Sequence, residues 1–235
     1  MNQILLYGNK CSGLSDEGLG YNEHMKKQLL FMHGGEAFSS HEDYFRYLEG
    51  AIVEEPEYKN KSRWYYGLEL QEALGKGWQV MRPDMPCKEN AKYAEWKIWF
   101  EKYAAHLQDE AILCGHSLGA MFLARYLSEC DPEEQWGFDP ELVMLVAGAY
   151  QEGALEGEDD EGFFVQDKQG WERLRSYGKR IMLVHSKDDF VVPFENHEHA
   201  KQELPNAKEM VFGDRGHFLQ ETFDELIKNF DQRSI

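Results

Sequence analysis

Two continuous apolar runs, Leu142–Ala147 (LVMLVA) and Ile181–His185 (IMLVH), constrain the fold of this chain more than any other feature. Runs this short and this apolar predict strands buried on both faces, as in a parallel sheet covered by two layers of helices. Further strands are expected at Gln28–Met32, Trp78–Arg82, Ala111–Cys114 and Glu209–Phe212.

Helical patterns separate these strands. The pattern Ser39-Ser40-His41-Glu42, with Phe38 as a hydrophobic staple, predicts a capped helix that runs to about Val53. Other helices are expected at Ala91–Leu107, with Trp96, Trp99, Phe100 and Tyr103 on one side, and at Leu118–Cys130, His197–Glu203 and Leu219–Phe230. Strands that alternate with helices predict the α/β class: a mainly parallel central sheet with helices on both faces, a three-layer sandwich.

The chain length of 235 residues suits one domain, which we expect to span residues 25–235. Residues 1–24 are expected to be an N-terminal extension, because Met25 opens a run typical of a chain start; the alternative is an edge strand at Ile4–Tyr7.

Two segments, 54–66 and 153–170, interrupt the alternation of strands and helices. Inserts of this kind form lids or entrance walls, or they are solvated loops. Their aromatic residues would wall a substrate pocket or, as we prefer, pack in the core: Trp64, Tyr65, Phe163 and Phe164.

The net charge of −18, from 25 Lys and Arg against 43 Asp and Glu, argues against binding to nucleic acid or to an anionic membrane. No apolar run approaches the ~20 residues of a membrane-spanning helix. The four cysteines are scattered without the spacing of a zinc site, which indicates reduced thiols in a cytoplasmic protein.

The pentapeptide Gly115-His116-Ser117-Leu118-Gly119 lies between a predicted strand and a predicted helix. In such a turn the flanking glycines avoid clashes with the neighbouring strand and helix, and the serine hydroxyl projects above the sheet. The amide of Leu118, at the start of the helix, is positioned to donate to an oxyanion. The alternative is an ordinary tight turn with a small residue in its centre.

A serine nucleophile needs a base, and the base needs an orienting acid. Asp188 and Asp189 both follow a predicted strand, and His217 follows the last strand in a loop bounded by glycine. The order serine, acid, histidine matches that of a hydrolase triad, so we expect Ser117, one of the two aspartates and His217 to meet at the carboxyl edge of the sheet.

A second oxyanion donor is expected in the loop Met32-His33-Gly34-Gly35-Glu36, because glycines let the backbone approach a ligand. Gly35 is the first choice for this donor and Glu36 the second. Glu36 and His116 are also candidates for substrate contact.

The other histidines suggest no metal or cofactor. The pair His197 and His199 has i, i+2 spacing on a predicted helix, so the two side chains point to different faces. His185, at a strand end, is expected to pack or to bond locally.

The motifs FMHGG, CGHSLG, DDFVVPF and GHFLQETFDELI together resemble those of the small α/β-hydrolase-fold serine hydrolases of the retinoblastoma-binding protein 9 type and their bacterial relatives. The resemblance extends from Met25 to about Phe230. It implies that Ser117 is the nucleophile, His217 the base and Asp189 the acid, with Asp188 as the alternative acid. The segments after Tyr150 and around Trp64 are longer than a minimal member needs.

The function that we expect is hydrolysis of a small carboxylic ester, or of an amide or thioester, without a cofactor. The substrate would be a small molecule, and nothing in the sequence indicates a protein partner. Two alternatives stay open: a protein-interaction module with little turnover, and an acyltransferase that uses the same triad.

Overall fold

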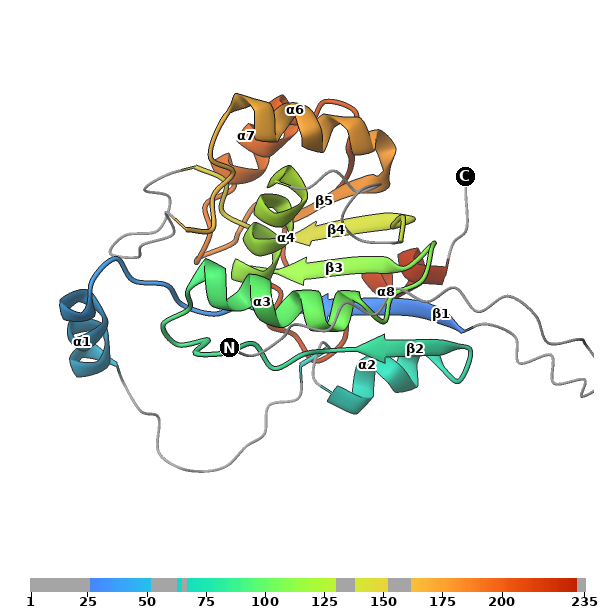
Figure 1. The fold of residues 1–235 in the computed structure, drawn as a ribbon, viewed down its shortest axis with the longest axis horizontal. Helices are drawn as coiled ribbons and strands as arrows, with labels where there is room; N and C mark the ends of the chain where they lie inside the picture. The colour runs from blue at the N-terminus through green and yellow to red at the C-terminus, as the bar shows by residue number, and fades with distance from the viewer. Residues whose placement is uncertain (1–25, 52–62, 65–66, 130–137, 152–161, 232–235) are drawn as a thin grey trace, which may run out of the picture.

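A computed structural model describes residues 26–51, 63–64, 67–129, 138–151 and 162–231. Within these ranges six strands form one parallel sheet in the order β2-β1-β3-β4-β5-β6 (Figure 1). The strands are β1 (Lys27–Met32), β2 (Trp78–Met81), β3 (Ile112–His116), β4 (Leu142–Val146), β5 (Ile181–Ser186) and β6 (Lys208–Phe212). All six predicted strands are confirmed.

Helices pack on both faces of the sheet, as the alternating pattern predicts. They are α2 (Gly67–Leu74), α3 (Tyr93–Ala104), α4 (Leu118–Glu129), α6 (Lys168–Tyr177), α7 (Glu195–Glu203) and α8 (Asp224–Asp231), with a short 3₁₀ turn at Gly178–Arg180. Helix α1 (His41–Gly50) lies apart from the strands (Figure 1). In Figure 1, α3 and α4 cross in front of the strands and α8 lies behind them. The predicted three-layer α/β sandwich is therefore confirmed.

Alternate residues of each central strand enter two separate cores. In β1, Leu30 and Met32 join the core beneath α3, α4 and α6, whereas Leu29 and Phe31 join the core beneath α2 and α8. All four side chains are fully buried. A strand with apolar side chains on both faces explains the continuous apolar runs of the sequence.

Helix α1 differs from the other helices because no residue in it is buried. It begins at Ser40, whose hydroxyl accepts a hydrogen bond from the amide of Asp43 at 3.1 Å. The predicted capped helix is therefore present, with Ser40 of the pattern as its cap. The ring of Phe38 contacts Tyr44 and Tyr47, with centroids 5.6 and 5.0 Å apart, so it packs on the first turns as expected of a staple.

Two helices of the described residues were not predicted. Helix α2 and helix α6 begin in or beside the predicted inserts, where polar and acidic residues obscure the helical period. In α3, Trp99 is 38% exposed although Trp96 and Phe100 are fully buried. Trp99 therefore lies at the solvent-exposed margin of the predicted aromatic side, where its ring contacts Tyr103.

Helix α8 begins at Asp224 and not at Leu219. The carbonyl of Leu219 accepts from the Arg63 guanidinium, and that of Gln220 accepts from the amide of Trp64 at 3.2 Å. Because another segment occupies these carbonyls, residues 219–223 do not form a helical turn.

Several predictions lie outside the described residues. These are the extension 1–24 with its alternative strand, Tyr65, the helix end at Val53, and most of both predicted inserts. The described aromatic residues of the inserts, Trp64, Phe163 and Phe164, are buried in the two cores, as we preferred. No helix in the described part of the chain is long and apolar enough to cross a membrane.

The turn from β3 into α4 is crowded to the limit of backbone contact. A Cβ atom on Gly115 would lie 2.3 Å from the carbonyl oxygen of Gly119. A Cβ on Gly119 would lie 2.3 Å from the carbonyl oxygen of Met32 and 2.6 Å from that of His33. The expectation that both flanking positions must be small is confirmed, and α4 lies directly against the end of β1.

The substitution Gly119→Ala should lower the free energy of unfolding by about 3 kcal/mol, because the new methyl group meets backbone and not a flexible side chain. Urea denaturation measures this change. Gly77→Ala is the matched control, since a Cβ there has no atom within 4 Å. The control should alter stability by no more than about 1 kcal/mol. Equal losses in both variants would contradict the crowding.

Candidate active site

The candidate residues follow four strands and meet at the carboxyl edge of the sheet. His33 and Gly34 follow β1, Ser117 follows β3, Asp189 follows β5 and His217 follows β6. This edge is where α/β sheets bind ligands. Ser117 and His217 line one cavity, and His217 is hydrogen-bonded to Asp189.

Ser117 has a left-handed backbone, with φ of 55°. Its amide donates to the carbonyl of Val146 at 2.8 Å, and its carbonyl accepts from the amide of Ala120 at 2.9 Å. These two bonds hold a conformation that a residue with a side chain rarely adopts. The strained serine expected between strand and helix is therefore present.

The glycine loop after β1 passes directly over Ser117. A Cβ on Gly34 would lie 3.0 Å from the Cβ of Ser117 and 3.5 Å from its Oγ. A Cβ on Gly35 would lie 2.5 Å from the carbonyl oxygen of Lys88. Only glycines allow this approach. Leu118 is the first residue of α4, so its amide belongs to the first turn, whose N–H groups point out of the helix end.

The second-choice oxyanion donor does not fit the structure. The amide of Glu36 donates to the carbonyl of Lys88 at 2.8 Å, and the carbonyl of Glu36 accepts from the amide of Ala91 at 2.8 Å. With its N–H engaged in this way, Glu36 is excluded as the donor, and Gly35 stays the candidate. The half-buried Glu36 still lines the cavity, where it has access to a substrate.

His217 and Asp189 form a buried pair. The Nδ1 atom of His217 lies 2.9 Å from Oδ2 of Asp189 and 3.1 Å from its Oδ1. The amides of Val191 and Val192 also donate to Oδ1, at 2.8 and 2.9 Å. The carboxylate therefore fixes the tautomer of His217 with the proton on Nδ1, which leaves Nε2 as an acceptor.

Opposing effects act on the Asp189 carboxyl group. Burial raises its pKa, but the hydrogen bond and the charge interaction with His217, together with the amides of Val191 and Val192, lower it by more. The net effect holds the pKa below its ordinary value, so Asp189 is ionised at neutral pH.

Asp188 is placed differently from its neighbour. Its side chain is exposed, and it accepts from the hydroxyl of Ser186 and from the amide of Gly216 at 3.0 Å. These bonds, Ser186 first, lower the pKa of Asp188. Asp188 thus braces the loop that carries His217, whereas Asp189 contacts the ring itself.

His116 lies behind the site. It is 3% exposed, and its Nε2 lies 2.9 Å from the carbonyl oxygen of His217. Burial, reinforced by the charge of His217, lowers the pKa of His116 to about 3, so the ring is neutral. His116 also forms part of the cavity wall, so the substrate contact expected for it stays a prediction.

Sequence reasoning assigned no separate role to His33. Its Nε2 accepts from the amide of Met85 at 2.9 Å, so Nδ1 carries the proton and donates to the carbonyl of Gly34 at 2.6 Å. Burial lowers the pKa of His33 and keeps the ring neutral. The neutral ring fixes the glycine loop over Ser117. The sequence signal for this role is the position of His33 directly before Gly34 and Gly35.

The cavity that contains Ser117 has a volume of about 410 Å³. Apolar and charged side chains share its wall: Tyr47, Leu118, Met121, Val191 and Leu219 against Glu36, Arg82, Lys88 and Glu89. A cavity of this size and composition suits a small organic molecule with an apolar portion.

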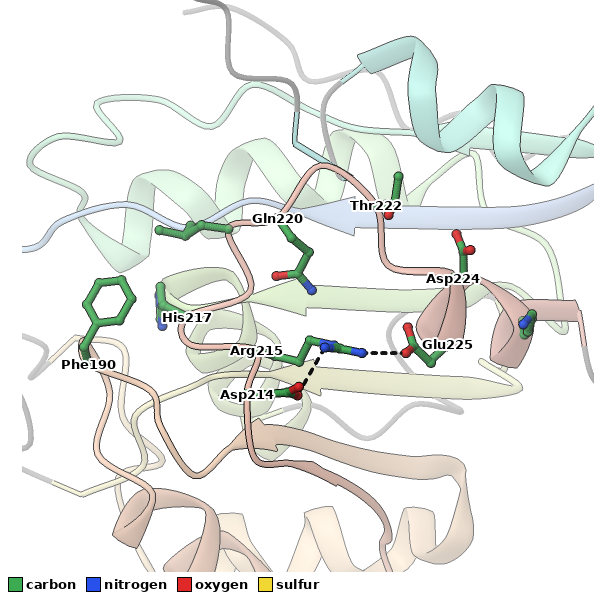
Figure 2. Close-up of a pocket in the computed structure, with 10 residues that line it drawn as sticks. Phe190, Asp214, Arg215, His217, Gln220, Thr222, Asp224 and Glu225 are labelled. Carbon is green, nitrogen blue, oxygen red and sulfur yellow. Dashed lines mark hydrogen bonds and ion pairs between the residues drawn. The ribbon is translucent and has the colours of Figure 1, made fainter.

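A second cavity, of about 600 Å³, shares His217 and Leu219 with the first. Figure 2 shows His217 and Phe190 at one end of it, with Arg215 between Asp214 and Glu225. Arg215 forms ion pairs with these acids at 3.1 and 2.7 Å. The loop of His217 thus separates two cavities, and its far side is held by charged groups.

His185, His197 and His199 each have a partner outside the candidate site. His185 lies 2.9 Å, through Nε2, from the carbonyl of Val192, as expected for a packed residue. His197 pairs with Glu209 at 3.3 Å, and the ring of His199 packs on Trp171. Among the residues that the structure describes, no group of three or more His, Cys, Asp or Glu could hold a metal ion.

A family model for serine hydrolases matches residues 53–226. The chain belongs to this family. It is 28% identical over 152 residues to the rat serine hydrolase RBBP9, covering 65% of this chain and 76% of that protein. It is 26% identical over 199 residues to YdeN of Bacillus subtilis, covering 84% of this chain and 88% of YdeN. The resemblance to the retinoblastoma-binding protein 9 type is thereby confirmed.

Solved structures share the fold. The Bacillus subtilis ydeN gene product has a TM-score of 0.63 at 20% identity. The match covers 88% of this chain and 100% of the ydeN product. Est1E from Butyrivibrio proteoclasticus has a TM-score of 0.55 at 15% identity, covering 89% and 87%. At these identities the likeness establishes the α/β-hydrolase fold.

Replacing the buried His116 should flatten the pH dependence of stability. Its pKa is about 3 in the folded protein against an ordinary 6.5, so below pH 6.5 only the unfolded chain takes up this proton. Unfolding free energy therefore falls with falling pH, by up to about 1.4 kcal/mol per pH unit from this group.

Urea unfolding of the wild type and of His116→Gln between pH 7 and pH 5 measures this contribution. The variant should have the shallower slope, because glutamine cannot take up the proton. The other buried histidines are present in both proteins and cancel. Identical slopes would contradict a neutral His116 in the folded protein.

Proposed function

We propose that this serine hydrolase cleaves small carboxylic esters through an acyl-enzyme intermediate, with Ser117 as nucleophile, His217 as base and Asp189 as acid. The observation that carries the proposal is the 2.9 Å bond from His217 to the buried Asp189, on a ring that lines the same cavity as Ser117. No cofactor is required for this chemistry.

The proposed base acts through its unprotonated Nε2. This atom takes the proton of the Ser117 hydroxyl as Oγ attacks the substrate carbonyl, and it returns the proton to the leaving alcohol. The imidazolium that forms in between is stabilised by the Asp189 carboxylate. Water then attacks the acyl-enzyme with the same base, and the acid is released.

The developing oxyanion would accept from the amides of Leu118 and Gly35. Leu118 opens α4, so the positive end of the helix dipole adds to its donation. Gly35 lies in the loop that His33 holds over Ser117. Two donors from separate segments would bind the oxyanion more tightly than the substrate carbonyl, which lowers the barrier.

An ester with an apolar acyl group fits the cavity wall best. Tyr47, Met121 and Val191 offer apolar surface within a volume of about 410 Å³. Solved proteins of the same fold include a thioesterase domain from a curacin biosynthetic pathway, with a TM-score of 0.54. An amide or thioester would use the same groups, so the proposed class is acyl transfer to water, with esters first.

A fluorophosphonate probe should label the wild type at Ser117, because a serine activated by His217 attacks phosphorus as it attacks a carbonyl. Ser117→Ala should give no labelled band and should lower ester turnover by about 10³-fold or more. Gel fluorescence and p-nitrophenyl ester assays measure the two effects. A folded wild type that neither labels nor turns over would refute the proposal.

Asp189→Asn should lower ester turnover by about 10³- to 10⁴-fold, because the amide cannot hold the base in the same tautomer or stabilise its charge. Asp188→Asn is the matched control, since an amide oxygen can still accept from Gly216 and Ser186. It should stay within about fivefold of the wild type. Steady-state kinetics decide, and the reverse ranking would move the acid to Asp188.

A further inference from the structure

The loop that carries His217 is tied at five consecutive residues by side chains from elsewhere in the chain. The ties are Ser186 to the amide of Arg215, Asp188 to the amide of Gly216, His116 to the carbonyl of His217, Trp64 to the carbonyl of Phe218 and Arg63 to the carbonyl of Leu219. A loop held at every residue cannot drift relative to the sheet.

One of these ties comes from the residue next to the nucleophile. His116 is the last residue of β3 and directly precedes Ser117. Besides the 2.9 Å bond from its Nε2 to the carbonyl of His217, its ring lies 4.9 Å from that of His217, centroid to centroid, at an angle of 50°. The nucleophile and the base are therefore linked through a single rigid residue of a central strand.

We infer that His116 is a positioning residue: its Nε2–H holds the carbonyl of His217, so that the base faces Ser117. The effect on turnover rests on the proposed function, whereas the positioning itself is a property of the folded protein. Displacement of a catalytic group by about 1 Å costs up to a hundredfold in rate, so such a tie matters.

The neutral state of the His116 ring suits a hydrogen-bond donor next to His217. The titratable groups that act on His116 are His217, Asp189 and His33. A lysine or arginine in this position would donate to the same carbonyl but would repel the positive charge that forms on His217 during turnover. A neutral imidazole supplies the hydrogen bond without that penalty. A glutamine would supply an N–H at similar reach but no ring.

Three variants separate the hydrogen bond from simple packing. His116→Gln keeps a donor, while His116→Phe keeps a ring and His116→Leu keeps apolar volume, and neither of the last two can donate. We expect both donor-free variants to lose about tenfold or more in kcat on a p-nitrophenyl ester with KM within about twofold. His116→Gln should recover most of the loss.

Proton NMR gives a readout that does not depend on turnover. The Nδ1–H of His217, in its bond to Asp189, should give a low-field resonance, assigned by its absence from His217→Gln. This resonance should persist in the wild type and in His116→Gln, and it should shift or broaden in the donor-free variants.

The outcomes are distinguishable. If the wild type has no activity but the resonance depends on a donor at position 116, the proposed function fails and the positioning stands. If the wild type is active but the three variants lose kcat equally, or the resonance is the same in all of them, His116 only fills space and the inference is wrong.

Discussion

The contact on which the site depends is the approach of α4 to the ends of β1 and β3. Gly119 lies so close to the carbonyls of Met32 and His33 that no side chain fits between them. This contact forces the left-handed backbone of Ser117 and brings the glycine loop over its hydroxyl. The two proposed oxyanion donors come from the two segments that meet there, so one packing constraint fixes the geometry of Ser117 and brings together the segments of both proposed donors.

Asp189, the proposed acid, is likewise bonded within its own loop. The same oxygen of Asp189 that lies near His217 also accepts from the amides of Val191 and Val192. The carboxylate therefore forms the turn after β5 and orients the imidazole at once. Phe190, which lies between Asp189 and these amides in sequence, is 76% exposed.

The sequence predicts those features that depend on local pattern or on order along the chain. Continuous apolar runs specify the strands because β4 and β5 are buried on both faces. The order of Ser117, Asp189 and His217 predicts that they converge because successive parallel strands end at one edge. The turn glycines follow from sterics alone.

Other features depend on contacts that no local pattern encodes. The bond from Trp64 to the carbonyl of Phe218 joins residues 154 positions apart. The Glu36 amide is not available to an oxyanion because it donates to the carbonyl of Lys88. The bond from His116 to the carbonyl of His217 depends on the orientation of the His116 ring. Helix α6 was not predicted because an acidic run precedes its cap, Asp167, in the sequence. Hydrogen bonds between segments far apart in the sequence can be identified only in the structure.

The position of His217 after β6 has a consequence for how the protein loses activity. β6 is the outermost strand on its side of the sheet and the most exposed of the six, with no fully buried residue, whereas Ser117 follows the wholly buried β3. Edge elements with few buried groups open at lower free energy than the core. Heat or mild denaturant should therefore open β6 first, whereas His217 stays beside the core until its loop also loses the bonds from Ser186, Asp188 and His116.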